Sequence, residues 1–249
     1  MPPPIAAKPV EDRCVAITGA FETNAGPPDC FAGVSGDFDG QALSFGVCQW
    51  NFGQDSLQPL LSAMLSNHEA VARSIFQDHF PVLAAALAAA KDDLMAFARS
   101  IQHPVKHTIN EPWRGMLREL GRTAEFQAIE VAAANRLIET ARAMCREYGL
   151  RSERALALMF DIVVQNGSIQ PIVKARIQKD FEALAPTRGE DPEVARMRIV
   201  ANRRAEAANP RWIEDVRIRK LCIANGAGKV HGIDYDLGEQ YGITLNPVP

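Results

Sequence analysis

The chain has 249 residues, of which 47% are hydrophobic and 23% charged, and its formal net charge is −3. This length and composition are typical of a globular protein of one large domain or two lobes, with a core that needs no metal or disulfide. The small net charge gives no support to nucleic-acid binding, which requires a clustered basic face. The five histidines and five cysteines form no HExxH motif and no tight Cys/His cluster. We therefore expect no nucleic-acid partner, no metal and no cofactor.

The N-terminus predicts neither a signal peptide nor a membrane anchor. Residues 1–10 are rich in proline and predict an extended arm or linker before one domain over residues 11–249. They lack the basic start and apolar run of a signal peptide. The longest apolar run, around residues 81–90, is too short to span a bilayer. We expect no membrane partner. Because no signal peptide is predicted, a target outside the cell would require another delivery route or a longer parent chain.

Hydrophobic periodicity predicts a mostly helical protein. Residues 11–21 are compatible with a helix that closes just before Glu22, and residues 24–29 have the composition of a turn. Residues 31–47 alternate between glycine breaks and predict a small irregular sheet. The tail, residues 235–249, reads as a loop or a short closing strand. From Ser56 the pattern is helical, over 57–65, 68–77, 81–101, 112–120, 124–148, 153–166, 169–184, 192–207 and 213–225. The expected fold is mainly α with a small N-terminal β-hairpin, in two lobes with a cleft between them.

Three carboxylates near the N-terminus carry the chemical argument. Glu22 follows apolar residues directly, so partial desolvation favours its protonated form, as a general acid requires. Asp37 and Asp39 lie two residues apart in GDFDG and are expected on the same side of a strand. Asp39 is the expected base, and Asp37 the expected sugar-binding or supporting carboxylate. A calcium loop would need further acids after Gly40, and none follow. An acid at a helix end and an acid on a hairpin form the pair needed to cleave a glycosidic bond.

Polar side chains after the hairpin acids are candidates for holding water and sugar. Ser44 follows Asp39 by five residues and offers a hydroxyl that could hold a water. Amide and aromatic groups that suit sugar binding follow at Gln41, Gln49, Trp50 and Asn51. Taken alone, the QWN segment is more typical of packing and helix capping.

Asp161 lies in the apolar segment LALMFDIVVQNG and needs a cationic partner if it is buried. Arg217 and Arg219 on the last long helix are the candidate partners. We expect a structural ion pair that positions the cleft and takes no direct chemical role.

The order of these features resembles the lysozyme superfamily and is most similar to glycoside hydrolase family 46 chitosanases. The matching residues are Glu22, the Asp39-Gly40 pair, Leu43-Ser44, and Gly46 with the segment CQWNFGQDSLQPLL that follows it. The resemblance implies an inverting mechanism with Glu22 as acid, Asp39 as base and Ser44 orienting a water. It also implies an Asp–Arg network, which falls on Asp161 and Arg219 here.

Two departures from that family favour a different glycan. The QWNFGQ insert is not expected in a chitosanase, and the scattered arginines give no sign of an acidic cleft for polycationic chitosan. The pattern also resembles lysozyme-like domains of bacterial cell-wall-degrading toxins and phage lysins. We therefore expect a muramidase-type hydrolase whose partner is the peptidoglycan glycan strand.

Such an enzyme would act in the periplasm or outside the cell as an antibacterial toxin or lysin, with an immunity protein or a secretion carrier as a further partner. Two alternatives remain, namely a family 46-type chitosanase and a non-catalytic cell-wall-binding module.

Overall fold

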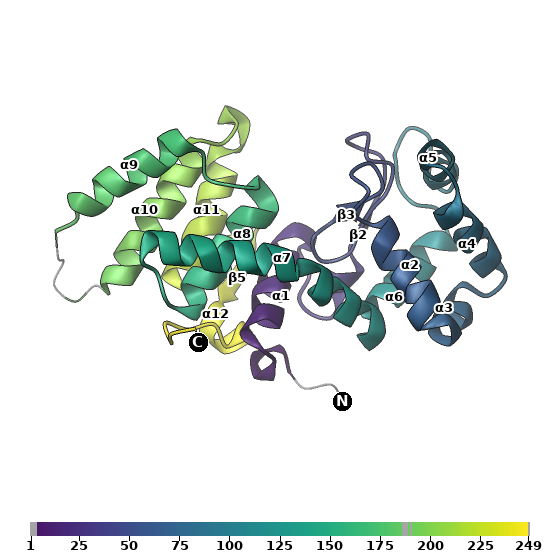
Figure 1. Ribbon diagram of the computed structural model, residues 1–249, viewed down its shortest axis with the longest axis horizontal. Coiled ribbons are helices and arrows are strands. Elements are labelled where there is room, and N and C mark those ends of the chain that lie inside the picture. Colours follow the sequence, from purple (N-terminus) through teal and green to yellow (C-terminus); the bar gives the residue numbers. More distant parts are fainter. Residues whose placement is uncertain (1–3, 186–188, 190, 249) are drawn as a thin grey trace. The chain divides into compact units, whose positions relative to one another are not determined.

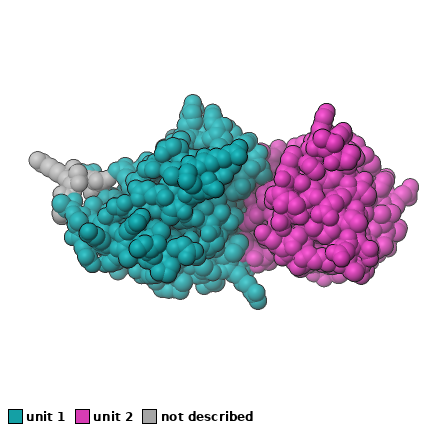
Figure 2. Space-filling view, turned by 90° about the horizontal axis from the view of Figure 1, so that it is seen from above, with its two compact units in different colours: residues 1–24, 135–249 teal, residues 25–134 magenta. Residues whose placement is uncertain are grey.

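The computed structural model describes residues 4–185, 189 and 191–248. The chain forms two compact units, residues 25–134 and residues 1–24 with 135–249 (Figures 1 and 2). The long helix α7, Ala124–Tyr148, contributes residues to both units. Helices dominate, and a small three-stranded antiparallel sheet lies near the N-terminus, which confirms the predicted fold class.

The sheet of the 25–134 unit has three short strands. Strands β1, β2 and β3 pair antiparallel in sequence order, with Val34 opposite Phe45 and Ser44 opposite Asn51. Each strand has two residues, namely Val34–Ser35, Ser44–Phe45 and Trp50–Asn51. The helices of this unit before α7 are η2 Asp29–Ala32, α2 Gln58–Asn67, α3 Glu69–Phe76, η3 Gln77–His79, α4 Phe80–Ala88, α5 Lys91–Ser100 and α6 Trp113–Arg122.

The single helix expected over residues 81–101 is wrong. The structure divides it into α4 and α5, because Ala89 and Ala90 adopt extended backbone angles. Asp92 and Asp93 then lie in the first turn of α5, where negative charge favours a helix start. The alanine run hides this break, since alanine is the strongest helix former.

Two apolar helices form the core of the other unit. Helix α1, Val10–Thr23, packs on α8, Glu153–Asn166, and both bury long continuous stretches of their residues. The Ser152 side chain begins α8 by accepting a hydrogen bond from the Ala155 N–H. Helix α11 in turn packs on α8 and α10 (Figure 1). The remaining helices are η1 Ile5–Ala7, α9 Pro171–Glu182, α10 Pro192–Glu206, η4 Pro210–Trp212, α11 Ile213–Asn225 and α12 Leu237–Tyr241.

Both ends of the chain differ in part from expectation. Residues 1–3 of the predicted N-terminal arm lie outside the described residues, whereas Ile5–Ala7 form η1, which packs on α1 and α12. The tail carries a hairpin and a helix. Strand β4, Ala227–Val230, pairs with β5, Ile233–Asp236, through a turn at His231-Gly232, where both residues have positive φ. Helix α12 follows β5 directly.

Four cysteines, Cys14, Cys30, Cys145 and Cys222, are buried free thiols. Within residues 4–185, 189 and 191–248, none of the helices combines the length and the apolar character that a membrane crossing requires.

Candidate active site

Glu22 lies in the last turn of α1, which ends two residues later than the sequence predicts. Helix α1 continues to Thr23, and Asn24 ends it in the left-handed conformation with φ 56°. The preceding residue, Phe21, is buried, and its ring meets Tyr235 of β5 edge-on at 4.9 Å between centroids. This contact fixes the end of α1, while the Glu22 side chain itself stays 27% exposed.

Glu22 is bound by an arginine that also binds a second carboxylate. Arg219 of α11 places Nη1 2.7 Å from Oε1 of Glu22 and Nη2 2.6 Å from Oδ1 of Asp161. Its Nε donates to the same Asp161 carboxylate at 2.9 Å, so the two groups make a bidentate pair. Arg219 is therefore the partner of Asp161, whereas Arg217 lies 3.3 Å from Glu214.

Lys220 is a second cation in this cluster, and the sequence reasoning missed it. Its ammonium group contacts the Asp161 carboxylate and donates to Oε1 of Gln165 at 2.6 Å. Thr18 of α1 also donates to Asp161, at 3.2 Å. A usable sequence signal for Lys220 was its position directly before the apolar run LCIA of α11.

The cluster is deeply buried, and its charges compensate one another. Asp161 and Lys220 are 0% exposed and Arg219 is 2% exposed. Burial alone raises the pKa of Asp161, but the charges of Arg219 and Lys220 outweigh it and lower that pKa. Burial lowers the pKa of Lys220, and the Asp161 charge opposes this effect. Two cations face one buried carboxylate, and Glu22 is the second acid that Arg219 binds.

Asp37 and Asp39 do not lie on a strand, so the expectation that they share one face of it is wrong. Both lie in the loop between β1 and β2, because the ladder stops at Ser35 and resumes only at Ser44. Gly40, with φ 81°, breaks the extended alternation within this loop.

The two loop acids have different surroundings. Asp37 accepts hydrogen bonds from the Ala42 N–H and from Nε of Arg99, both at 2.7 Å. Burial raises the pKa of Asp37, but these hydrogen bonds outweigh it and lower that pKa. Asp39 is exposed and accepts from the Gln41 N–H at 3.2 Å. Asp37 thus holds the loop together, while the Asp39 carboxylate stays open to solvent.

The other candidate residues lie in or next to the sheet. Ser44 is buried in β2, and Trp50 and Asn51 are buried in β3. The Asn51 side chain accepts from the Gln54 N–H at 2.8 Å. The Gln49 side chain donates to two backbone carbonyls, those of Gly33 and Gly46. Gln41 is half-buried, and its side chain lies against Gly53.

Glu130 of α7 is a buried acid that the sequence reasoning missed. It is 0% exposed, and Oε1 accepts from the Val47 N–H at 2.9 Å, in the turn after β2. Among the described residues, Oε2 has no hydrogen-bond partner. Burial raises the pKa of Glu130 well above its ordinary value. A usable signal was its i+4 spacing from Phe126, whose ring stacks on Phe45 in the core.

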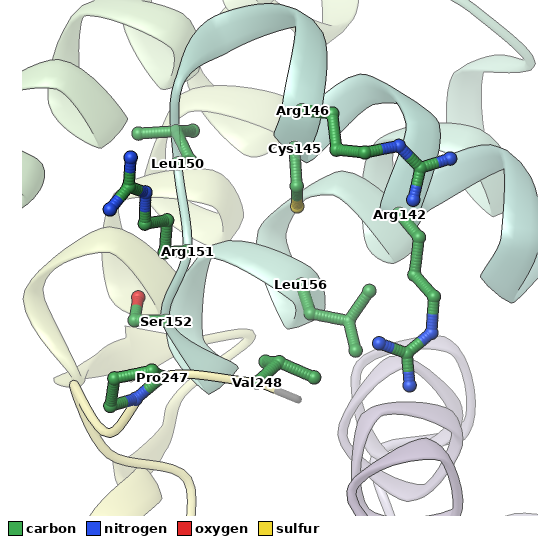
Figure 3. Close-up of a pocket in the computed structure, with 9 residues that line it drawn as sticks. All are labelled: Arg142, Cys145, Arg146, Leu150, Arg151, Ser152, Leu156, Pro247 and Val248. Atoms are coloured by element: carbon green, nitrogen blue, oxygen red, sulfur yellow. The ribbon is translucent and has the colours of Figure 1, made fainter.

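A pocket elsewhere in the protein does not serve as the site. It has a volume of about 250 Å³ and includes no Asp or Glu among its lining residues. The guanidinium groups of its three arginines point in different directions (Figure 3), and Arg142 is bound to Glu11. Its lining residues are Arg142, Cys145, Arg146, Leu150, Arg151, Ser152, Leu156, Pro247 and Val248. Among the residues that the structure describes, no group of three or more His, Cys, Asp or Glu side chains could hold a metal ion.

Comparisons with known proteins identify the fold. No protein-family model and no curated protein matches the sequence. Solved structures do match. A family 46 chitosanase of Gynuella sunshinyii in complex with chitotetraose aligns with a TM-score of 0.56 at 15% identity, over 91% of this chain and 96% of that one.

A chitosanase variant of Bacillus subtilis MY002 complexed with glucosamine units aligns with a TM-score of 0.58 at 17% identity, over 93% of this chain and 97% of that one. At such identities the likeness concerns the fold alone. The resemblance to family 46 chitosanases noted in the sequence is confirmed at the level of the fold.

Proposed function

We propose that the protein is a glycoside hydrolase in which Glu22 and Asp39 act on the same glycosidic bond. The observation that carries the proposal is the contrast between the two carboxyls in a chain with this fold. Glu22 is held by the buried Arg219, and Asp39 is left open to solvent. Glu22 donates a proton to the leaving oxygen, and Asp39 removes a proton from the attacking water. Ser44, next to the loop, is the proposed water-orienting hydroxyl.

The buried cluster supports this chemistry by positioning its acid. Arg219 is fixed by two hydrogen bonds from Nε and Nη2 to Asp161, so its remaining nitrogen presents a preset site to Glu22. Preorganised groups of this kind cost no reorganisation when charge develops in the transition state. We assign Asp161 and Arg219 a positioning role.

The substrate that the observations favour is a β-1,4-linked glucosamine polymer such as chitosan. The two similar structures above carry chitotetraose and glucosamine units. In addition, residues 25–134, which include Asp39, hold more Asp and Glu than Lys and Arg. An acidic surface attracts a polycationic chain.

Peptidoglycan is the second candidate, and one observation favours it. Two acids in the same unit as Asp39 are already neutralised, Asp37 by Arg99 and Asp55 by Lys91, both at 2.7 Å. These ion pairs leave less unpaired negative charge in this unit to attract a polycation, and a neutral or anionic glycan would not need that charge. A wall-degrading role would also require delivery of the chain to the periplasm or the cell exterior.

Parallel digestions separate these substrates. Reducing-end release from soluble chitosan identifies a chitosanase, and soluble muropeptides released from purified sacculi identify a peptidoglycan hydrolase. The inverting mechanism predicts that the first product detected by NMR is the α-anomer. Activity on neither polymer would contradict the proposal and favour a binding module.

Substitutions test the two roles. Glu22→Gln removes the acid and is expected to lower kcat by about 10²–10⁴-fold with the fold unchanged. Glu69→Gln is the matched control, because Glu69 forms an exposed pair with Arg73 and has no proposed role. Asp39→Asn is expected to cost orders of magnitude in rate and Asp37→Asn less. An equal or larger loss of rate for Asp37→Asn would show that the assignment of Asp39 as the base is wrong.

A further inference from the structure

An exposed aromatic ring stands beside the proposed base. Phe38 lies between Asp37 and Asp39 in the β1–β2 loop, and 67% of its surface is exposed. A phenylalanine in this state contributes little of the free energy that burying its ring would provide. Single exposed apolar residues are common on protein surfaces, so exposure alone assigns no role. The surroundings of the ring carry the argument.

A second ring completes an aromatic surface with Phe38. The centroids of Phe38 and His107 lie 5.6 Å apart with the ring planes inclined at 68°. His107 comes from the turn after α5, in which the His107 N–H donates to the His103 carbonyl at 2.9 Å. Gly36 permits this close approach of the two segments, because a Cβ there would lie 1.9 Å from the carbonyl oxygen of His107.

The loop that presents Phe38 is tied down at both ends. The buried Gln102 side chain accepts from the Asp37 N–H at 2.8 Å and donates to the Ala42 carbonyl at 2.9 Å. Arg99 adds its ion pair with Asp37. Since these bonds flank Phe38 on both sides, the backbone that carries the ring is held in place before any ligand arrives. Such preorganisation lowers the entropic cost of binding.

We propose that Phe38, supported by His107, is a stacking platform for a pyranose ring of the glycan next to the bond on which Glu22 and Asp39 act. One face of a β-linked pyranose presents a patch of axial C–H groups, and these pack on the negative face of an aromatic ring. A glucosamine ring adds an ammonium group, which aromatic faces also attract. This assignment rests on the proposed function, because it names how that site holds its substrate.

Binding of a glucosamine hexamer, measured by calorimetry in a Glu22→Gln background that prevents cleavage, tests the platform. Phe38→Ala is expected to raise Kd about tenfold, which corresponds to about 1.4 kcal/mol. Phe38→Trp is expected to keep the parent affinity. Phe38→Leu, which keeps apolar surface but has no ring, is expected to behave like Phe38→Ala. Ile172→Ala removes a comparably exposed apolar side chain on α9 and serves as the control with unchanged Kd.

The NMR chemical shifts of the bound sugar distinguish stacking from a purely structural role of Phe38. Protons on the stacked sugar face are expected to shift upfield in the parent complex through the ring current, and Phe38→Leu is expected to abolish that shift. In the active enzyme, Phe38→Ala should raise KM and leave kcat within about twofold.

Two different failures remain distinguishable. If the parent binds the hexamer and Phe38→Ala binds it equally well, the platform is refuted and the proposed function stands. If the parent binds neither the hexamer nor peptidoglycan fragments, the proposed function itself fails, and the platform with it.

Discussion

Replacing Glu130 by glutamine should make the protein more stable, and increasingly so as the pH rises. Glu130 is 0% exposed, contacts no cation in the described part of the chain, and receives one hydrogen bond, from the Val47 N–H. A carboxylate in these surroundings is costly, so the folded state keeps Glu130 protonated and its pKa is raised. Glutamine keeps the shape and the acceptor oxygen but carries no titratable proton.

The sign and size of the effect follow from proton linkage. In the unfolded chain Glu130 ionises near pH 4.3, while in the folded protein it holds its proton to a higher pH. The stability that Glu130 contributes is complete below the unfolded value and is lost as the pH rises toward the folded one. Over that window the wild type should lose about 1.4 kcal/mol per pH unit relative to Glu130→Gln, because one extra proton is bound in the folded state.

Urea unfolding followed by circular dichroism at pH 4.5, 5.5, 6.5 and 7.5 measures this difference. Glu139→Gln is the matched control, because Glu139 lies on the same helix with its side chain 71% exposed. Its stability difference from the wild type should stay within about 0.5 kcal/mol at every pH. A difference between Glu130→Gln and the wild type that does not change with pH would refute the reasoning.

Two further substitutions test the packing around the candidate site. Asp161→Asn removes the buried carboxylate that Lys220 and Arg219 share, leaves Arg219 with Glu22, and should destabilise the protein by about 3–5 kcal/mol in urea unfolding. Asp234→Asn removes an exposed acid of the β4–β5 hairpin and should cost at most about 1 kcal/mol. Gly46→Ala should cost more than Gly40→Ala in thermal unfolding, because both glycines have positive φ but a Cβ meets Glu130 Oε1 at 1.8 Å only at Gly46. Equal losses at the two glycines would show that the turn moves freely away from Glu130.

The helices could be read from the sequence because periodicity is a local signal. The pattern from Ser56 onward predicts nearly every helix, and the errors fall where the local signal is weak. Ala89 and Ala90 adopt extended backbone angles although alanine is the strongest helix former, so the residue type does not predict the break. At His231-Gly232 the two-residue hairpin turn has a histidine at a position where asparagine or aspartate is the usual signal.

The candidate site was predictable by residue type but not by contact. The sequence indicates Glu22, Asp39 and a buried Asp161, because acids beside apolar residues are conspicuous. The sequence does not show that the Asp37 carboxylate pairs with Arg99, because Arg99 lies 62 residues away along the chain. Glu130 likewise depends on Val47, 83 residues away. Such long-range pairs leave no periodic trace in a single sequence.

The reactivity of the buried cysteines can report local unfolding of the protein. Burial raises the pKa of the thiols of Cys14, Cys30, Cys145 and Cys222, and the thiolate is the form that alkylating reagents attack. Each of these side chains should therefore stay unmodified until its surroundings open. Cys30 lies in the 25–134 unit and the other three in the other unit. The order in which iodoacetamide labels them, read by mass spectrometry, would show which unit opens first.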